Sequence, residues 1–244
     1  MLTDHLELQM QLKSLKLASI REHAQQVEQI AIAKNYSYTQ YLSHLCQLEI
    51  DSRQTNRLKR WIKESRLPKH KTLSNFNFNH IPNVKPEQIN ALAETDMWVE
   101  SGNNIIIFGP SGVGKTHLAA AIAYRKIEKE TQVRFFQTSH LVQMLQLSKK
   151  QYRLKDELIK LDRIPLLVLD DIGYVKKDEH ETSVLFELIC HRYETGSMII
   201  TSNQPFSQWD SIFPDNMTAV AAIDRLLHHA NVISIEGDSY RLKK

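Results

Sequence analysis

The first quarter of the chain carries hydrophobic residues at helical spacing. Leu8, Leu12 and Leu15 fall on one stripe, and Leu42, Leu45 and Ile50 fall on another, with polar residues between them. No glycine or proline interrupts residues 2–67, although either would weaken the interior of a helix. The pattern predicts an all-helical N-terminal domain over residues 1–67, for which oligomerisation or partner binding is the expected role.

A linker and a second domain are expected to follow. Three prolines, Pro68, Pro82 and Pro86, and an asparagine-rich stretch at 74–79 end the helical pattern. Beyond them, five short apolar runs alternate with helical segments. Strands separated by helices favour a parallel sheet covered on both faces. We therefore expect an α/β domain over residues 68–244, with strands at 105–108, 133–136, 166–169, 198–201 and 232–235.

Composition excludes several classes of protein. Among the 244 residues, 42% are hydrophobic and 24% are charged, which is typical of a globular protein rather than a disordered or fibrous one. No run approaches the roughly 18 apolar residues of a membrane-spanning helix, and the N-terminus does not resemble a secretory signal. We expect a cytoplasmic protein with no membrane partner. Cys46 and Cys190 lack metal-site spacing and are expected to be buried thiols.

Positive charge is concentrated near the end of the helical domain. Residues 1–71 hold 12 Lys and Arg against 7 Asp and Glu, whereas the remainder hold 19 against 21. Arg53, Arg57 and Arg60 fall at i, i+4 and i+7, so they share one helix face that could meet a phosphate backbone. A solvated helix face explains the same pattern equally well.

Residues 109–116 match the phosphate-binding pattern G-x-x-x-x-G-K-[ST] directly after an expected strand and before an expected helix. Three of the seven glycines of the chain lie in these eight residues, where they let backbone amides wrap around a polyphosphate. Lys115 is expected to reach the β and γ phosphates, and the Thr116 hydroxyl to ligate magnesium. The predicted nucleotide-binding residues are Gly109, Pro110, Ser111, Gly112, Val113, Gly114, Lys115, Thr116 and His117.

Two later strands end in polar residues that suit hydrolysis of a bound nucleotide. Asp170 and Asp171 follow the apolar run at 166–169, where Asp170 could hold magnesium and Asp171 could polarise the attacking water. Asn203 follows the run at 198–201 and could hold that water or a γ-phosphate oxygen. A polar turn is the alternative reading of each segment.

The sequence leaves two roles open for each of two arginines. Arg225, in a helical stretch, could pair locally or project into the nucleotide site of a neighbouring subunit and stabilise transition-state charge. The same alternatives apply to Arg241, close to the C-terminus. His228 and His229 are adjacent and diverge on a helix, so they do not predict a metal site.

Taken together, these motifs resemble the IstB-type transposition helper ATPases, relatives of the DnaC helicase loaders within the AAA+ class. The resemblance spans essentially the whole chain. It rests on the phosphate loop and on narrower blocks: Leu-Asp-Asp-Ile-Gly-Tyr at 169–174, Arg-Tyr-Glu at 192–194, Thr-Ser-Asn-Gln-Pro-Phe at 201–206, Asp-Arg-Leu-Leu-His-His at 224–229 and Gly-Asp-Ser-Tyr-Arg at 237–241.

The resemblance implies an ATPase of a bacterial insertion sequence that uses ATP and Mg²⁺. Such proteins assemble as homo-oligomers on double-stranded DNA, bend it and recruit and stimulate the cognate transposase. Asp170 then corresponds to the Walker B acid, Asn203 to sensor I, Arg225 to a trans-acting arginine finger and Arg241 to sensor II. Many AAA+ proteins have Glu at the position of Asp171, so slow hydrolysis, stimulated by assembly, is expected.

DNA contacts are expected in one of two places. In related loaders, helices inserted before the Walker B strand line the nucleic-acid channel, and the matching segment here holds Lys149, Lys150, Arg153 and Lys155. The face of Arg53, Arg57 and Arg60 is the alternative. Two other functions remain open: a helicase loader that binds single-stranded DNA, and a monomeric P-loop kinase, which the strand-end Asn203 disfavours.

Overall fold

A computed structural model describes residues 2–174, 179–193, 195–205, 208–209, 216–237 and 239–240. The chain forms two compact units, Met1–Arg60 and Trp61–Lys244. The sequence places the domain boundary later, after residue 67, and that division into functional domains stays a prediction. In the part of the chain that the structure describes, no helix is long and apolar enough to cross a membrane.

The N-terminal unit is helical, as its hydrophobic pattern predicts. It contains α1 (Leu2–Ser14), α2 (Ala18–Ala33) and the first part of α3 (Tyr38–Ser65). Lys16 and Asn35 take left-handed backbone conformations, with φ of 55° and 51°, in the two connections. Because neither turn uses glycine, the sequence gives no clear sign of where the helices end. Cys46 is exposed, so the expectation of a buried thiol is wrong there.

One carboxylate joins the helices of this unit. Oε2 of the buried Glu49 accepts hydrogen bonds from the amides of Ser19 (2.9 Å) and Ile20 (3.3 Å) at the start of α2, and Oε1 accepts one from Arg53 Nε (2.8 Å). Burial by itself raises the pKa of Glu49, but these hydrogen bonds together lower it below its ordinary value. Arg53 also donates to the carbonyl of Lys16 at 2.9 Å, so it holds the helices of its own unit together.

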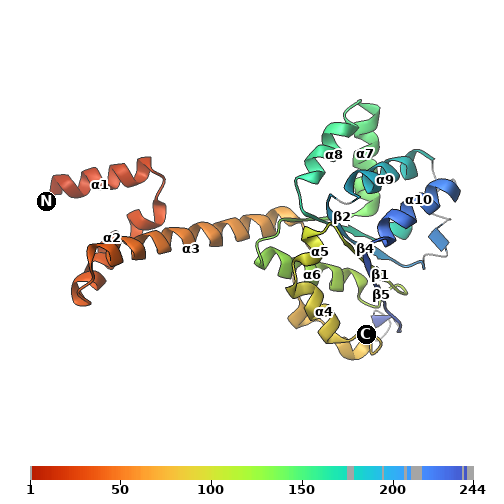
Figure 1. The fold of residues 1–244 in the computed structure, drawn as a ribbon, viewed down its shortest axis with the longest axis horizontal. Coiled ribbons are helices and arrows are strands. Elements are labelled where there is room, and N and C mark those ends of the chain that lie inside the picture. Colours follow the sequence, from red (N-terminus) through yellow and green to blue (C-terminus); the bar gives the residue numbers. More distant parts are fainter. Residues whose placement is uncertain are drawn as a thin grey trace. The chain divides into compact units, whose positions relative to one another are not determined.

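The second unit is an α/β domain whose elements alternate along the chain (Figure 1). Its linker region carries two short 3-10 helices, η1 (Leu73–Asn75) and η2 (Phe78–His80), and a third, η3 (Ile172–Tyr174), lies beyond the third strand. The strands are β1 (Asn104–Phe108), β2 (Val133–Gln137), β3 (Leu166–Asp170), β4 (Ser197–Ser202) and β5 (Ala230–Ser234). The helices are α4 (Pro86–Glu94), α5 (Met97–Glu100), α6 (Lys115–Glu128), α7 (Thr138–Lys150), α8 (Leu154–Asp162), α9 (Glu179–Arg192) and α10 (Asn216–Leu227).

The five strands form one parallel sheet in the order β2-β3-β4-β1-β5. The expected parallel sheet flanked by helices is confirmed. The central strands β1, β3 and β4 are buried along their whole length, as strands covered on both faces require. The carboxyl ends of β3 and β1 therefore meet at one edge, with β4 between them.

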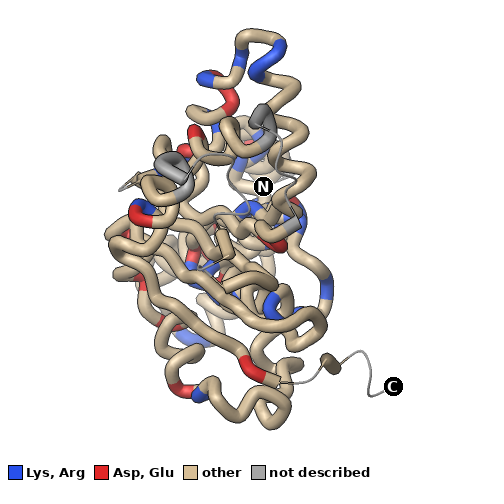
Figure 2. The backbone as a smooth tube through the Cα atoms, turned by 90° about the vertical axis from the view of Figure 1, so that its right-hand side faces the viewer, with Lys and Arg blue, Asp and Glu red and all other residues tan. Residues whose placement is uncertain are grey.

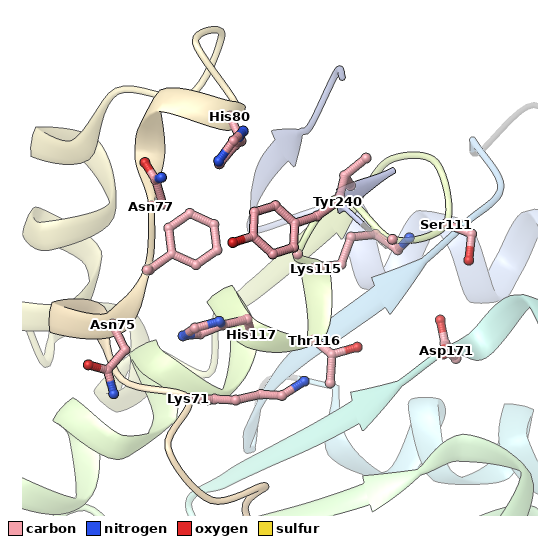
Figure 3. A pocket seen from close by; sticks show the side chains of 14 residues that line it. Lys71, Asn75, Asn77, His80, Ser111, Lys115, Thr116, His117, Asp171 and Tyr240 are labelled. Atoms are coloured by element: carbon pink, nitrogen blue, oxygen red, sulfur yellow. The ribbon is translucent and has the colours of Figure 1, made fainter. Parts of the chain in front are cut away.

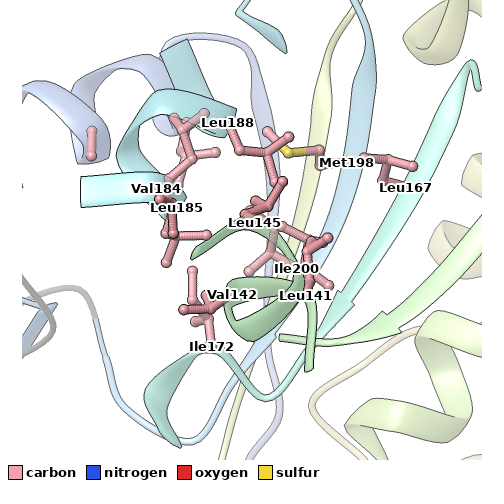
Figure 4. Close-up of a cluster of buried hydrophobic side chains, with 14 of the residues drawn as sticks. Leu141, Val142, Leu145, Leu167, Ile172, Val184, Leu185, Leu188, Met198 and Ile200 are labelled. Carbon is pink, nitrogen blue, oxygen red and sulfur yellow. The ribbon is translucent and has the colours of Figure 1, made fainter. Parts of the chain in front are cut away.

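Each face of the sheet has its own layer of helices. Ile106, Leu167 and Ile200 face α7 and α9 in a buried cluster (Figure 4). Side chains alternate along a strand, so Ile105 and Ile107 point to the opposite face, where α6 packs against β1, β3 and β4. The sheet-facing part of α6 is rich in buried alanine, and these small side chains let the helix lie close behind the phosphate loop.

A buried arginine holds the amino ends of β3 and β4. Arg192, at the end of α9, is only 1% exposed, and its guanidinium donates to the carbonyls of Leu161 (2.9 Å), Ile164 (3.1 Å), Pro165 (3.1 Å) and Ser197 (3.1 Å). Burial lowers the pKa of Arg192 to about 10, which still leaves it protonated at neutral pH. A planar, multiply donating cation suits this cluster of carbonyls better than a lysine does.

We expect Arg192→Ala to lower the free energy of unfolding by about 3 kcal/mol or more, because it leaves several buried carbonyls without donors. Chemical denaturation of the full chain measures the change. Arg163→Ala is the matched control, since Arg163 is exposed nearby and its loss should cost less than about 0.5 kcal/mol. Equal stability of the two variants would contradict the structural role assigned to Arg192.

Candidate nucleotide-binding site

The predicted phosphate loop lies between the end of β1 at Phe108 and the start of α6 at Lys115. Gly112 and Gly114 have φ of 86° and 104°, conformations that other residues rarely adopt. A Cβ atom at Gly112 would overlap Ser239 Oγ, and one at Gly114 would lie 3.1 Å from the ring of Phe76. The two glycines therefore permit both the turn and the close approach of neighbouring segments.

Lys115 is nearly buried and turned into the loop. Its ammonium donates to the carbonyls of Gly109 (2.8 Å) and Pro110 (2.7 Å). The lysine is 6% exposed and still lines the pocket beside the loop. The helix behind it begins here, so its first amides and the positive end of its dipole face the same space.

Asp170 at the end of β3 connects the loop with the neighbouring strands. Its carboxylate accepts hydrogen bonds from the hydroxyls of Thr116 (3.0 Å) and Thr201 (2.7 Å), and its backbone carbonyl accepts one from Thr138 (2.8 Å). The three threonines come from α6, β4 and α7. A single buried acid, 4% exposed, therefore fixes three elements around the end of β3.

The pKa of Asp170 is shifted by its burial and by the groups around it. Burial raises the pKa of Asp170 above its ordinary value, and the charge of Asp171 adds to the rise. Hydrogen bonds from Thr201 and Thr116, and the positive charge of Lys71, act in the opposite direction. A cation that entered beside the carboxylate would therefore be stabilised.

Asp171 has a left-handed backbone conformation with φ of 58°. Its amide donates to Thr201 Oγ1 at 2.8 Å, so the same hydroxyl group holds both aspartates. Residues other than glycine seldom adopt this conformation. The turn directs Asp171 into the pocket, where it is one of the lining residues.

A pocket of about 370 Å³ lies beside the phosphate loop, within the size range of small-molecule sites. Four parts of the second unit form it: the linker, the loop with the start of α6, Asp171 after β3, and Tyr240 near the C-terminus (Figure 3). The lining residues are Lys71, Asn75, Phe76, Asn77, His80, Ser111, Gly112, Val113, Gly114, Lys115, Thr116, His117, Asp171 and Tyr240.

The linker wall of this pocket was not predicted as part of the site. His117 Nε2 lies 3.0 Å from the carbonyl of Thr72 and donates to it, and the Phe76 ring packs edge-on against His117 with centroids 5.0 Å apart. His80 and Tyr240 form a second aromatic pair at 4.9 Å. In the sequence, the alternating asparagine and phenylalanine residues at 75–78 could have indicated this wall, because paired aromatic rings are unusual in a flexible linker.

The other predicted catalytic residues lie outside this lining. Asn203 packs against Gly173, and its Oδ1 is buried with no hydrogen-bond partner among the described residues. Arg225 donates to the carbonyl of Ala221 at 3.1 Å and lies 5.8 Å from the Phe186 ring centroid. Arg241 lies outside the described residues. The roles of all three stay predictions.

The expected DNA-contacting lysines and arginines do not share one environment. Lys149 pairs with Glu187 and donates to Ser183 Oγ, both at 2.7 Å. Lys150, Arg153 and Lys155 are exposed around the connection between α7 and α8. Figure 2 shows Lys and Arg positions at its top, the height at which α7 and α8 meet in Figure 1.

The residues around Asp170 suit magnesium rather than a metal held entirely by protein. Among the described residues, no group of three or more His, Cys, Asp or Glu side chains could hold a metal ion. Magnesium in nucleotide sites takes one or two protein oxygens and completes its coordination with phosphate and water. The Thr116 hydroxyl and the Asp170 carboxylate are such a pair.

Comparison with known proteins gives the family. The family model described as IstB-like ATP binding protein matches residues 10–244. The chain belongs to the IstB-like ATP binding protein family. A Sinorhizobium fredii (strain NBRC 101917 / NGR234) protein named as an insertion sequence ATP-binding protein is 42% identical over 238 residues, 98% of this chain and 80% of that protein. The IS21 insertion sequence ATP-binding protein named in Pseudomonas aeruginosa is 36% identical over 238 residues, 98% and 89% of the two chains.

Solved structures show the fold of this IstB-like chain. The DnaC helicase loader has a TM-score of 0.58 at 22% identity, covering 72% of this chain and 99% of that one. AMPPCP-bound DnaA from Aquifex aeolicus has a TM-score of 0.57 at 22% identity, covering 73% of this chain and 54% of that one, so this chain matches only about half of DnaA. The parallel sheet and these likenesses show the AAA+ P-loop fold, and ATP binding is the property by which the family is described.

Proposed function

We propose that this protein is an ATP-hydrolysing transposition helper, which assembles on duplex DNA in its ATP state, bends the DNA and recruits the cognate transposase. The observation that carries the proposal is the pocket in which the phosphate loop, Asp171 and the linker meet beside Asp170. Membership of a family of insertion-sequence proteins supports the biological setting. ATP hydrolysis acts as the release step.

In this proposal the loop amides, Lys115 and the positive end of α6 bind the phosphates. Thr116 and Asp170 hold Mg²⁺, which neutralises charge on the phosphate oxygens when bound. Asp171, directed into the pocket, polarises the attacking water. Asn203 orients that water through its side-chain amide, and the unsatisfied buried oxygen of Asn203 supports a polar partner in the loaded state.

Arg225 acts in the pocket of an adjacent copy in the proposed assembly. It is absent from the lining of its own chain's pocket and lies on α10 beside a shallow hollow lined, mostly through apolar atoms, by Val220, Ile223, Asp224, Leu227 and His228. Val220 is 62% exposed. An apolar hollow beside a partly exposed arginine suits a contact between subunits, in which the arginine stabilises transition-state charge.

The assembly itself is the first prediction. We expect the purified protein to form a larger species with ATP or a non-hydrolysable analogue and duplex DNA, and to return to a smaller one with ADP. Size-exclusion chromatography with light scattering measures both. Lys115→Ala, which removes a phosphate-binding charge, should stay small in every nucleotide. A wild-type chain that remains monomeric under all conditions contradicts the proposal, and a preference for single-stranded over duplex DNA in competition would favour the helicase-loader function.

A second prediction tests the trans role of Arg225. We expect Arg225→Ala to bind ATP within about threefold of wild type while its hydrolysis falls by about a thousandfold, a typical effect of removing an arginine finger. A mixture of Arg225→Ala and Lys115→Ala chains should recover part of the activity, because one supplies the pocket and the other the arginine. Arg163→Ala is the control with unchanged turnover. If the two chains assemble together by light scattering and the mixture is still as inactive as its components, Arg225 does not act in trans.

A third prediction concerns DNA. Binding through phosphates releases counterions, so affinity should fall steeply with salt and vary little with sequence. Replacing Lys150 or Arg153 by alanine should reduce the slope of log K against log salt by about one unit, as measured by fluorescence anisotropy. Lys85→Ala, an exposed lysine at the start of α4, is the control. An unchanged slope in both test variants would place the DNA elsewhere.

A further inference from the structure

A second lysine, which the sequence analysis did not assign, lines the nucleotide pocket. Lys71 lies in the linker, ahead of η1, and is one of the residues that form the pocket wall. Figure 3 shows its side chain extended from the linker toward Thr116. The residue is half-buried, unlike the exposed Lys69 of the same linker.

No partner satisfies this ammonium in the part of the chain that the structure describes. Lys115, by contrast, donates to two loop carbonyls. The charge of Lys71 nevertheless acts on two groups of the site: it partly opposes the burial that raises the pKa of Asp170, and it contributes to the lowered pKa of His117, for which burial is the larger cause. A half-buried cation with free donors, next to a phosphate loop, suits an anionic ligand.

The backbone that carries Lys71 is fixed to the helix behind the phosphate loop. The carbonyl of Thr72, the next residue, accepts the hydrogen bond from His117. A few residues earlier, the carbonyl of Pro68 accepts a weaker hydrogen bond from Tyr124 at 3.4 Å. Lys71 is thus held between two attachments to α6, and its side chain has a defined direction rather than that of a free surface lysine.

The side chain of Lys71 points toward one end of the phosphate chain of a bound nucleotide. The loop amides surround the position of the inner phosphates, and Lys115 reaches the β and γ phosphates from the loop side. Lys71 instead extends toward Thr116, whose hydroxyl is bonded to Asp170, the side that the proposed function gives to magnesium and the terminal phosphate. ADP has no γ-phosphate to place there.

We propose that Lys71 is a second phosphate-binding lysine, which reaches from the linker to the γ-phosphate of bound ATP and makes the pocket prefer ATP over ADP. The inference rests on the proposed function, because it takes this pocket as the ATP site. It adds a phosphate contact from outside the sheet, so the linker responds to whether the terminal phosphate is present.

Isothermal titration of the full chain with ATP, a non-hydrolysable analogue and ADP, each with Mg²⁺, tests this role. We expect Lys71→Ala to weaken binding of ATP and the analogue roughly 10- to 100-fold, the effect of losing one charge-assisted hydrogen bond, and to change ADP binding less than about threefold. Lys71→Arg should restore much of the preference. Lys69→Ala, an exposed lysine of the same linker outside the pocket, should bind both nucleotides as wild type does.

The possible results separate this inference from the proposed function. If wild type binds neither ATP nor ADP, the proposed function fails. If wild type binds ATP and Lys71→Ala loses ATP and ADP equally, or loses neither, only the role of Lys71 is wrong. Unchanged ADP binding also shows that the variant is folded. If Lys71→Ala does not fold, ATP and ADP binding can be compared in Lys71→Gln, which keeps most of the side-chain length without the charge.

Discussion

The arrangement of the site depends on one buried carboxylate. Asp170 ends a strand that is fully buried, and its carboxylate is tolerated there because hydroxyls from Thr116 and Thr201 donate hydrogen bonds to it. An acid without such donors would be costly to bury. The same contacts hold the start of α6 and the end of β4 against β3, so the phosphate loop is positioned before any ligand enters. The carboxylate can be buried only where β3, α6 and β4 meet, and its hydrogen bonds in turn hold these three elements together.

The sequence predicted those parts of the molecule that local patterns determine. Apolar runs located the five strands, and glycines with a following Lys-Thr located the phosphate loop, because each signal lies within a few adjacent residues. The helix breaks at Lys16 and Asn35 carry no glycine and were not predicted. The wall formed by Phe76 and His80 was also not predicted, since it results from contacts between segments distant in sequence.

Arginine shows why residue type alone does not identify function. Arg53, in a basic run, hydrogen-bonds to Glu49 within its own helical unit. Arg192, in one of the sequence blocks that carry the family resemblance, is buried, donates to backbone carbonyls of neighbouring segments and lies 3.8 Å from a carboxylate oxygen of Asp162. Arg225 retains partial exposure beside an apolar hollow. A guanidinium can satisfy a carboxylate, a set of carbonyls or a phosphate, and only burial and partners distinguish these uses.

The pocket also depends on two segments that lie outside the sheet. The linker contributes Phe76 and His80, and the C-terminal segment contributes Tyr240, whose amide donates to the carbonyl of Gly112 at 3.1 Å. Hydrogen bonds to α6 and to the phosphate loop, rather than a strand ladder, hold these segments in place. A ligand that touches the sheet edge and both segments at once stabilises this arrangement by its own binding free energy. The alignment around Asp170 rests on threonine hydroxyls that already donate to it, so a bound ligand adds contacts chiefly between the sheet edge and these two segments.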